Sequence, residues 1–291
     1  MTHLRLWLLA ARPRTLPAAI APVLVGTALA GSEDIFRAGP FIAALLGSVF
    51  IQIGTNLSND YSDARRGADT EDRLGPVRVT AGGLMPPRRV LVGTYVAFGV
   101  AVAAGLYLAA VAGWELLVVG AASILAGVLY TGGPRPYGYE GLGELFVFTF
   151  FGLVAVAGSY FVQVEDLRWE AVALGVPVGL LAAAILVVNN VRDVDTDRRA
   201  GKRTLAVKLG RDRARVLFVA MVVVAFLVPI ALIPALSAWL LLVLAALPLV
   251  PPLVRTVRTR TDGPALNGAL AATGRLLAVF SLLLALGVLL S

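Results

Sequence analysis

The chain has 291 residues, of which 58% are hydrophobic and only 15% are charged. A soluble domain usually carries about 25% charged residues, so this composition is typical of an integral membrane protein. The sequence contains no cysteine and a single histidine, His3, which argues against disulfides, cysteine nucleophiles and zinc or iron held by thiolate or histidine ligands. The net charge of +7 comes from basic residues in alternating loops, a distribution that argues against nucleic-acid binding.

Apolar stretches close to the length that crosses a bilayer, about 20 residues, recur along the whole chain. No small-residue cleavage site follows the first one, which predicts a retained helix and not a signal peptide. We therefore expect an all-α polytopic membrane protein with one domain over residues 1–291. The nine transmembrane helices that we predict cover residues 15–31, 41–59, 90–112, 114–131, 144–163, 171–190, 215–235, 237–254 and 268–290.

The distribution of basic residues predicts the orientation of these helices, because cytoplasmic loops are enriched in Lys and Arg. With a cytoplasmic N-terminus, all 25 Lys and Arg residues except Arg37 and Arg168 fall on the cytoplasmic side. A helix missed or added in the count would reverse this bias midway along the chain. The pattern therefore favours nine helices with the N-terminus in the cytoplasm.

Two aspartate-rich segments then lie at the same, cytoplasmic membrane face: NLSNDYSDARRGAD (Asn56–Asp69) and NNVRDVDTD (Asn189–Asp197). Carboxylates beside a bilayer are costly unless a cation neutralises them. If each helix continues through its segment, two sets of side chains each share one helical face: Asn56, Asp60 and Asp63, and Asn189, Asp193 and Asp197. Two such faces would form an oxygen-lined cup suited to a hard cation such as Mg²⁺.

Basic residues follow both segments, namely Arg65 and Arg66, and Arg198, Arg199, Lys202 and Arg203. Together with a metal they would form a diphosphate clamp, although short charged loops between membrane helices are often only topology signals. A third loop, Tyr130–Glu144, is either an ordinary Gly- and Pro-rich turn or a segment that brings Tyr130 and Arg135 to the cup, where the Tyr ring would face a developing cation. Arg12 and Arg14 are predicted to be topology anchors and not ligands.

At these residues the sequence resembles the UbiA superfamily of intramembrane prenyltransferases. Asn59, Asp60 and Asp63 match the first family motif, NDxxDxxxD, whose last position falls on Gly67, two residues before Asp69. The second motif, DxxxD, matches Asp193 and Asp197, and Tyr130 and Arg135 fall where the family has a Tyr followed by a basic residue. The resemblance implies nine helices around a central cavity, in a bacterial inner (plasma) membrane, with the active site facing the cytoplasm.

Longer strings are similar to the branch of the family whose acceptor is 1,4-dihydroxy-2-naphthoate, in menaquinone biosynthesis: RPRTLPAAIAPVLVGTALA, YTGGPRPYGYEGLGELFVF and NNVRDVDTDRRAGKRTLAVKLG. This resemblance implies Mg²⁺-dependent transfer of a polyprenyl group from polyprenyl diphosphate to the acceptor, with loss of CO₂ and diphosphate, giving demethylmenaquinol among the membrane lipids. It implies Mg²⁺ ligation by Asp60, Asp63, Asp193 and Asp197, a catalytic role for Tyr130, proton uptake by Asp69 or Asp63, and substrate binding by Asn56, Asn59, Arg135, Asn189, Lys202 and Arg203.

Three alternatives remain open from the sequence. Another enzyme of the same superfamily would use 4-hydroxybenzoate, homogentisate or haem as its acceptor. A secondary transporter would place its functional charges near the bilayer midplane, whereas the carboxylates here gather at one membrane face. A CDP-alcohol phosphotransferase needs a DGxxAR motif with further spaced Gly and Asp residues; Asp63-Ala64-Arg65 matches only a fragment of it.

Overall fold

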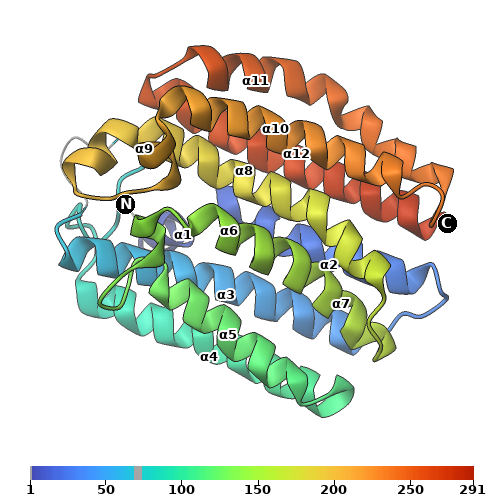
Figure 1. Ribbon diagram of the computed structural model, residues 1–291. Helices are drawn as coiled ribbons and strands as arrows, with labels where there is room; N and C mark the ends of the chain where they lie inside the picture. The colour runs from blue at the N-terminus through green and yellow to red at the C-terminus, as the bar shows by residue number, and fades with distance from the viewer. Residues whose placement is uncertain (1, 69–73) are drawn as a thin grey trace.

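The computed structural model describes residues 2–68 and 74–291, which form a bundle of helices without a β-strand (Figure 1). This confirms the predicted all-α class. The α-helices are α1 (His3–Ala11), α2 (Pro17–Gly31), α3 (Ala38–Arg65), α4 (Pro87–Ala112), α5 (Glu115–Leu129), α6 (Gly143–Val147), α7 (Ala155–Val164), α8 (Trp169–Arg199), α9 (Leu205–Leu209), α10 (Arg211–Ala231), α11 (Val250–Thr259) and α12 (Gly263–Leu289). The 3₁₀ segments are η1 (Pro13–Thr15), η2 (Tyr137–Glu140) and η4 (Ala238–Leu249), and η3 (Phe148–Val154) is a π-helix.

Seven helical segments of the described chain are long and apolar enough to cross a membrane. The number rises to eight if α1 and α2, which are bent by 53° at η1, form one broken span. Helix α5 is also apolar but has only 15 residues. The protein is therefore a multi-pass membrane protein, while the count of nine helices and the cytoplasmic N-terminus stay predictions.

Helix α8 is the central helix of the bundle. It packs against α10, α12 and η3, and its residues between Ala171 and Val188 are mostly small or aliphatic and mostly buried. A helix that is apolar all round belongs in the interior of a protein or a membrane. Outer helices instead expose large apolar side chains, such as Tyr95, Val216 and Leu282, as expected of a surface that faces lipid.

The π-helix η3 lies directly against α8 where both carry glycine. A Cβ atom built on Gly152 would lie 2.5 Å from the Cα atom of Gly179 and 2.6 Å from the carbonyl oxygen of Gly175. Only glycine allows two backbones to approach so closely, as in other small-residue contacts between membrane helices. π-Helical turns are rare and are frequent at functional sites, and here the segment brings Phe150 and Phe151 to the wall of a cavity.

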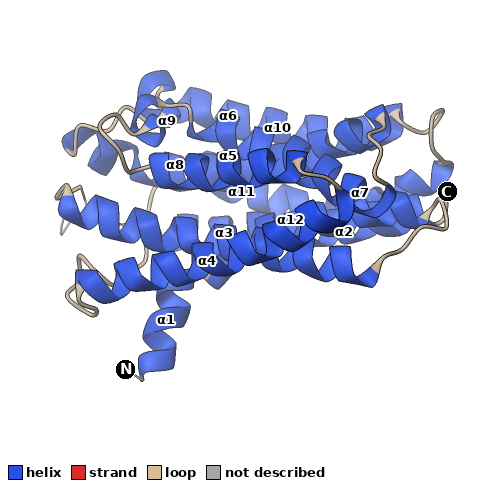
Figure 2. Cartoon of the chain, turned by 90° about the horizontal axis from the view of Figure 1, so that it is seen from below, coloured by secondary structure: helices blue, strands red, loops and turns tan. Residues whose placement is uncertain are grey.

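The segments that follow α3, α5 and α8 meet at one end of the bundle, on the left in Figure 1. The backbone N–H of Arg203, after α8, donates to the carbonyl of Tyr139, after α5, over 2.8 Å. The C-terminus lies at the opposite end (Figure 1), and α1 projects from the side of the bundle in Figure 2. Both aspartate segments are thus carried to one end by the helices in which they lie, α3 and α8.

Candidate active site

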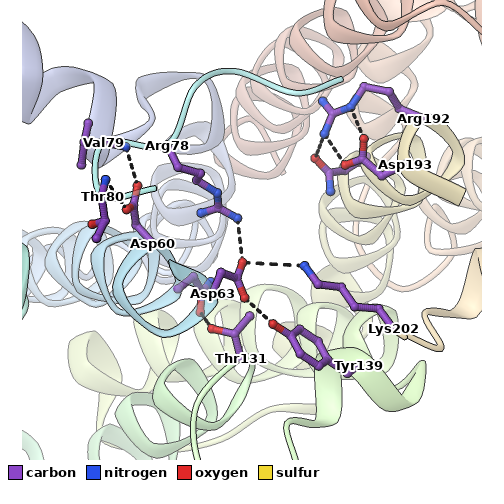
Figure 3. Close-up of polar contacts among 12 residues, drawn as sticks. Asp60, Asp63, Arg78, Val79, Thr80, Thr131, Tyr139, Arg192, Asp193 and Lys202 are labelled. Atoms are coloured by element: carbon purple, nitrogen blue, oxygen red, sulfur yellow. Dashed lines mark hydrogen bonds and ion pairs between the residues drawn. The ribbon is translucent and has the colours of Figure 1, made fainter. Parts of the chain in front are cut away.

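Asp63, near the end of α3, lies at the centre of a polar cluster at this end of the bundle (Figure 3). Its Oδ2 atom lies 3.1 Å from Nη2 of Arg78 and 3.9 Å from Nζ of Lys202. Its Oδ1 atom accepts a hydrogen bond of 2.5 Å from the hydroxyl of Tyr139. Because Asp63 is 1% exposed, its carboxylate depends on these partners, two cations and one hydroxyl, in place of water.

Lys202 follows the second aspartate segment, so its contact with Asp63 joins the two segments. The Lys202 side chain is itself buried, and its Nζ atom lies 4.9 Å from the centre of the Tyr139 ring, in cation–π geometry. The chain after α8 is therefore joined to Asp63 by a cation, whereas the oxygen-lined cup of aspartates from both segments stays a prediction.

Asp60 lies one turn before Asp63 on α3, and its carboxylate accepts hydrogen bonds from backbone N–H groups. Its two carboxylate oxygens accept hydrogen bonds from the backbone N–H groups of Val79 and Thr80, over 3.0 and 2.9 Å. This holds the loop that presents Arg78 to Asp63. Each carboxylate oxygen has a further lone pair, so these contacts leave Asp60 able to accept another partner.

Asp193 on α8 pairs with its neighbour Arg192, from Nε to Oδ1 over 2.8 Å and from Nη2 to Oδ2 over 2.5 Å (Figure 3). Arg192 is 1% exposed, and its Nη1 atom also donates to Asn267 of α12 over 2.6 Å. Asn267 in turn donates to the carbonyl of Leu74 over 3.0 Å. The chain segment that carries Arg78 is therefore tied to both aspartate segments.

The three predicted asparagines also have protein partners. Asn59 accepts a hydrogen bond from the Thr131 hydroxyl over 2.8 Å, and Asn189 accepts one from Nη2 of Arg192 over 2.8 Å. Asn56 donates to the carbonyl of Ala11 over 2.9 Å. All three line the cavity described below.

The structure does not bring every predicted residue to this cluster. Arg135 has an 81% exposed side chain that pairs with Glu140, and this hydrogen bond lowers the pKa of Glu140 below its usual value. Arg203 is exposed, and its described contact is made by its backbone. Asp197 is half-buried near the end of α8. Asp69 lies outside the described residues.

A cavity of about 330 Å³ extends from the cluster into the bundle. Its polar lining includes Arg78 and the three asparagines, and its aromatic lining includes Tyr130, Tyr137, Phe146 and Phe150. The rings of Tyr137 and Phe146 are stacked with centroids 4.0 Å apart, and Tyr130 meets Tyr137 edge-on at 5.5 Å. Because Arg78 both lines the cavity and pairs with Asp63, the cluster opens onto an apolar chamber.

Sequence reasoning missed four residues of this region: Arg12, Arg78, Tyr139 and Arg192. Arg78 is the single cation of the stretch LGPVRVTAGGLMPP, which is mostly Gly, Pro and apolar residues, and Tyr139 lies in the same Tyr-rich loop as the predicted Tyr130. These local signals do not say which residue turns inward. Arg12, predicted to be a topology anchor, instead lines the cavity.

The donor set fits a hard divalent cation, since the predicted ligands offer carboxylate and amide oxygens. Among the described residues, no group of three or more acidic or histidine side chains could hold a metal ion. Mg²⁺ is usually bound by one or two carboxylates together with substrate phosphates. The arrangement therefore suits a cation that is held jointly by the protein and a phosphorylated substrate.

Solved structures of similar fold cover almost the whole chain. A UbiA homologue from Archaeoglobus fulgidus bound to GPP and Mg²⁺ is 14% identical, with a TM-score of 0.64 over 96% of this chain and 99% of that one. A UbiA homologue from Aeropyrum pernix K1 is 17% identical, with a TM-score of 0.71 over 92% and 96%. At these identities the likeness concerns the fold.

Sequence relatives are closer. The 1,4-dihydroxy-2-naphthoate octaprenyltransferase of Mycobacterium tuberculosis is 42% identical over 96% of this chain and 95% of its own length. The enzyme of that name from Escherichia coli is 38% identical over 98% and 95%. The sequence pattern of the UbiA prenyltransferase family matches residues 19–266. The chain therefore belongs to the UbiA prenyltransferase family.

Proposed function

We propose that the protein transfers a polyprenyl group from polyprenyl diphosphate to 1,4-dihydroxy-2-naphthoate, with release of diphosphate and CO₂, to give demethylmenaquinol. The observation that carries this proposal is the cluster around Asp63, where Arg78 and Lys202, two cations with little exposed side-chain surface, contact one buried carboxylate, and where Arg78 also lines an apolar cavity. The names of the relatives from M. tuberculosis and E. coli support the choice of acceptor. The active site would face the cytoplasm from the plasma membrane.

Diphosphate binding falls to the polar end of the site. Asp60, Asp63, Asp193 and Asp197 would hold Mg²⁺, which when bound neutralises diphosphate charge and so favours cleavage of the allylic C–O bond. Arg78 and Lys202 bind the phosphate oxygens and offset the charge that develops on them. Their contacts with Asp63 hold both cations in position before substrate arrives.

The apolar cavity then governs the fate of the allylic cation. Its aromatic wall keeps water from the cation, which would otherwise be hydrolysed, and the ring of Tyr130 stabilises positive charge through its π-face. A carbon of the electron-rich acceptor ring forms the new C–C bond, and the ring carboxylate leaves as CO₂, which restores aromaticity. A carboxylate such as Asp63 takes a phenolic proton during attack and returns it as CO₂ departs.

A transfer assay with purified protein in detergent tests this proposal. Radiolabelled polyprenyl diphosphate and Mg²⁺ are supplied with either 1,4-dihydroxy-2-naphthoate or 4-hydroxybenzoate. We expect prenylated product from the naphthoate only, lost with EDTA and in Asp63→Asn, and retained in the control Asp212→Asn, whose side chain is 95% exposed. Product from 4-hydroxybenzoate instead would overturn the acceptor, and no product from either would overturn the function.

A further inference from the structure

The break between α1 and α2 holds Arg12 in an unusual conformation. Arg12 has φ +53° and ψ +70°, in the left-handed region. Residues other than Gly, Asn and Asp rarely adopt this region, because Cβ then approaches the backbone. Such strain persists only where the surrounding structure over-determines it, and it is concentrated at functional sites.

Two amides of α3 fix this break from within the bundle. Gln52 and Asn56 both donate to the hydroxyl oxygen of Thr15, over 3.0 and 3.2 Å. The Thr15 hydroxyl donates in turn to the carbonyl of Arg12 over 3.0 Å, and Asn56 also binds the carbonyl of Ala11. Gln52 and Asn56 are themselves buried, so the backbone of Arg12 is held by partners that cannot turn to water instead.

Two cationic residues from different parts of the chain line the cavity. Among the described residues that line it, the charged side chains are Arg12 and Arg78. Arg78 belongs to the Asp63 cluster. Arg12 is anchored instead beside Asn56 and Gln52, which precede Asp60 on α3 by about 6 and 12 Å at 1.5 Å per residue. The backbone at Arg12 is therefore fixed beside residues that lie farther into the bundle than Asp60, and Arg12 is the second cationic residue of the cavity lining.

We propose that Arg12 binds the carboxylate of the aromatic acceptor. The inference rests on the proposed function, in which the cavity receives two anionic groups, a diphosphate and an aromatic carboxylate. The diphosphate takes the cluster of Asp63, Arg78 and Lys202, and Arg12 is the other cationic residue that lines the cavity. A guanidinium group matches a carboxylate with two parallel hydrogen bonds, and its fixed backbone reduces the entropy lost on binding.

Ligand binding without turnover tests the proposal. The probes are 1-hydroxy-2-naphthoate and 1-naphthol, which share a ring but differ in the carboxylate, titrated into purified protein by calorimetry without Mg²⁺ or prenyl diphosphate. We expect the wild type to prefer the naphthoate, and Arg12→Gln to weaken naphthoate binding roughly 10-fold to 100-fold while naphthol binding stays the same. Arg12→Lys should restore part of the preference.

Arg14 provides the matched control, because it lies two residues away in the same segment and is exposed. Arg14→Gln should bind both probes like the wild type. In steady-state assays Arg12→Gln should raise the KM for the acceptor and leave the KM for prenyl diphosphate unchanged. A rise in the prenyl diphosphate KM alone would overturn the proposal and assign Arg12 to the diphosphate site.

If Arg12→Gln weakened the binding of both probes equally, the proposal would also be overturned, since that result indicates a purely structural role for Arg12. Failure of the proposed function gives a different result. Binding of naphthoate that depends on Arg12, in a protein that transfers no prenyl group, would support the carboxylate site and refute the transfer reaction. Transfer to the naphthoate without any dependence on Arg12 would refute the carboxylate site alone.

Discussion

Lys202 reaches to 3.9 Å from the Oδ2 atom of Asp63 while it lies over the ring of Tyr139. Lys202 follows α8, Asp63 lies near the end of α3, and Tyr139 lies in η2, after α5. One small cluster therefore joins three parts of the bundle. The aromatic ring and the carboxylate together fix an ammonium group that would otherwise be mobile. The cluster thus holds these three segments together, and it is also the place where a diphosphate would bind.

Substitution of Tyr139 can separate its hydrogen bond to Asp63 from its ring contact with Lys202. Tyr139→Phe removes the hydrogen bond to Asp63 and keeps the ring under Lys202, whereas Tyr139→Ala removes both. We expect Tyr139→Phe to retain most of the affinity for prenyl diphosphate, and Tyr139→Ala to lose roughly 5-fold to 30-fold more because the cation–π contact contributes about 1–2 kcal/mol in a desolvated site. Equal affinities in the two variants would show that the ring does not position Lys202.

Asp60 is expected to contribute to stability through the loop that it holds. In Asp60→Asn, the side-chain NH₂ group replaces one acceptor, and a buried N–H of Val79 or Thr80 loses its partner at a cost of about 1–3 kcal/mol. Thermal unfolding in detergent should therefore begin at a lower temperature. The control is Asp195→Asn, whose carboxylate is 58% exposed and contributes at most about 1 kcal/mol; equal shifts in the two variants would contradict this account of Asp60.

Asn267 is expected to act on the aspartate site from α12. Asn267→Ala removes its bonds to Arg192 and Leu74, so Asp193 and the Arg78 segment lose a common support. Loss of such an outer partner typically weakens metal affinity or activity roughly 10-fold to 100-fold. The measurement is the Mg²⁺ concentration that gives half-maximal activity, with Thr273→Ala as control, because that hydroxyl bonds within α12 to Ala269. An unchanged Mg²⁺ requirement in Asn267→Ala would contradict the coupling.

Gly152 should tolerate no side chain. Gly152→Ala places a methyl group against the backbone of Gly179, and such overpacking costs about 1–3 kcal/mol or more. We expect a lower unfolding temperature and a displaced aromatic wall, since the π-helix carries Phe150 and Phe151. Gly99→Ala on α4, where a Cβ meets nothing within 4 Å, should unfold like the wild type; a parallel loss in both variants would refute the close packing.

Much of the architecture was predictable because it depends on local sequence. Apolar runs located most of the helices, and α3 and α8 continue through their aspartate segments as the spacing of Asp60 and Asp63, and of Asp193 and Asp197, predicted. The π-helix was not predictable from periodicity, since its cause is a contact between glycines of two different helices. The break before α2 likewise depends on Gln52 and Asn56 of α3.

The partners of the site residues were harder to predict. The sequence placed carboxylates and cations at one end of the bundle, but their pairing depends on contacts between distant segments. Arg78 was missed because it lies beyond the aspartate-rich run, and Tyr139 because two other tyrosines, Tyr130 and Tyr137, share its loop. Arg135 has the charge expected of a ligand but pairs with Glu140 at the surface.

In the proposed reaction, both aspartate segments bind one Mg²⁺–diphosphate group at the mouth of the cavity. The most direct test is binding of a prenyl thiolodiphosphate, which reacts slowly at the C–S bond, with and without Mg²⁺, to wild type, Asp63→Asn, Asp193→Asn and the exposed control Asp212→Asn. We predict binding that requires Mg²⁺, is retained in Asp212→Asn and is lost or strongly weakened in the other two variants. Binding that is independent of Mg²⁺, or that survives substitution of either segment, would contradict the account.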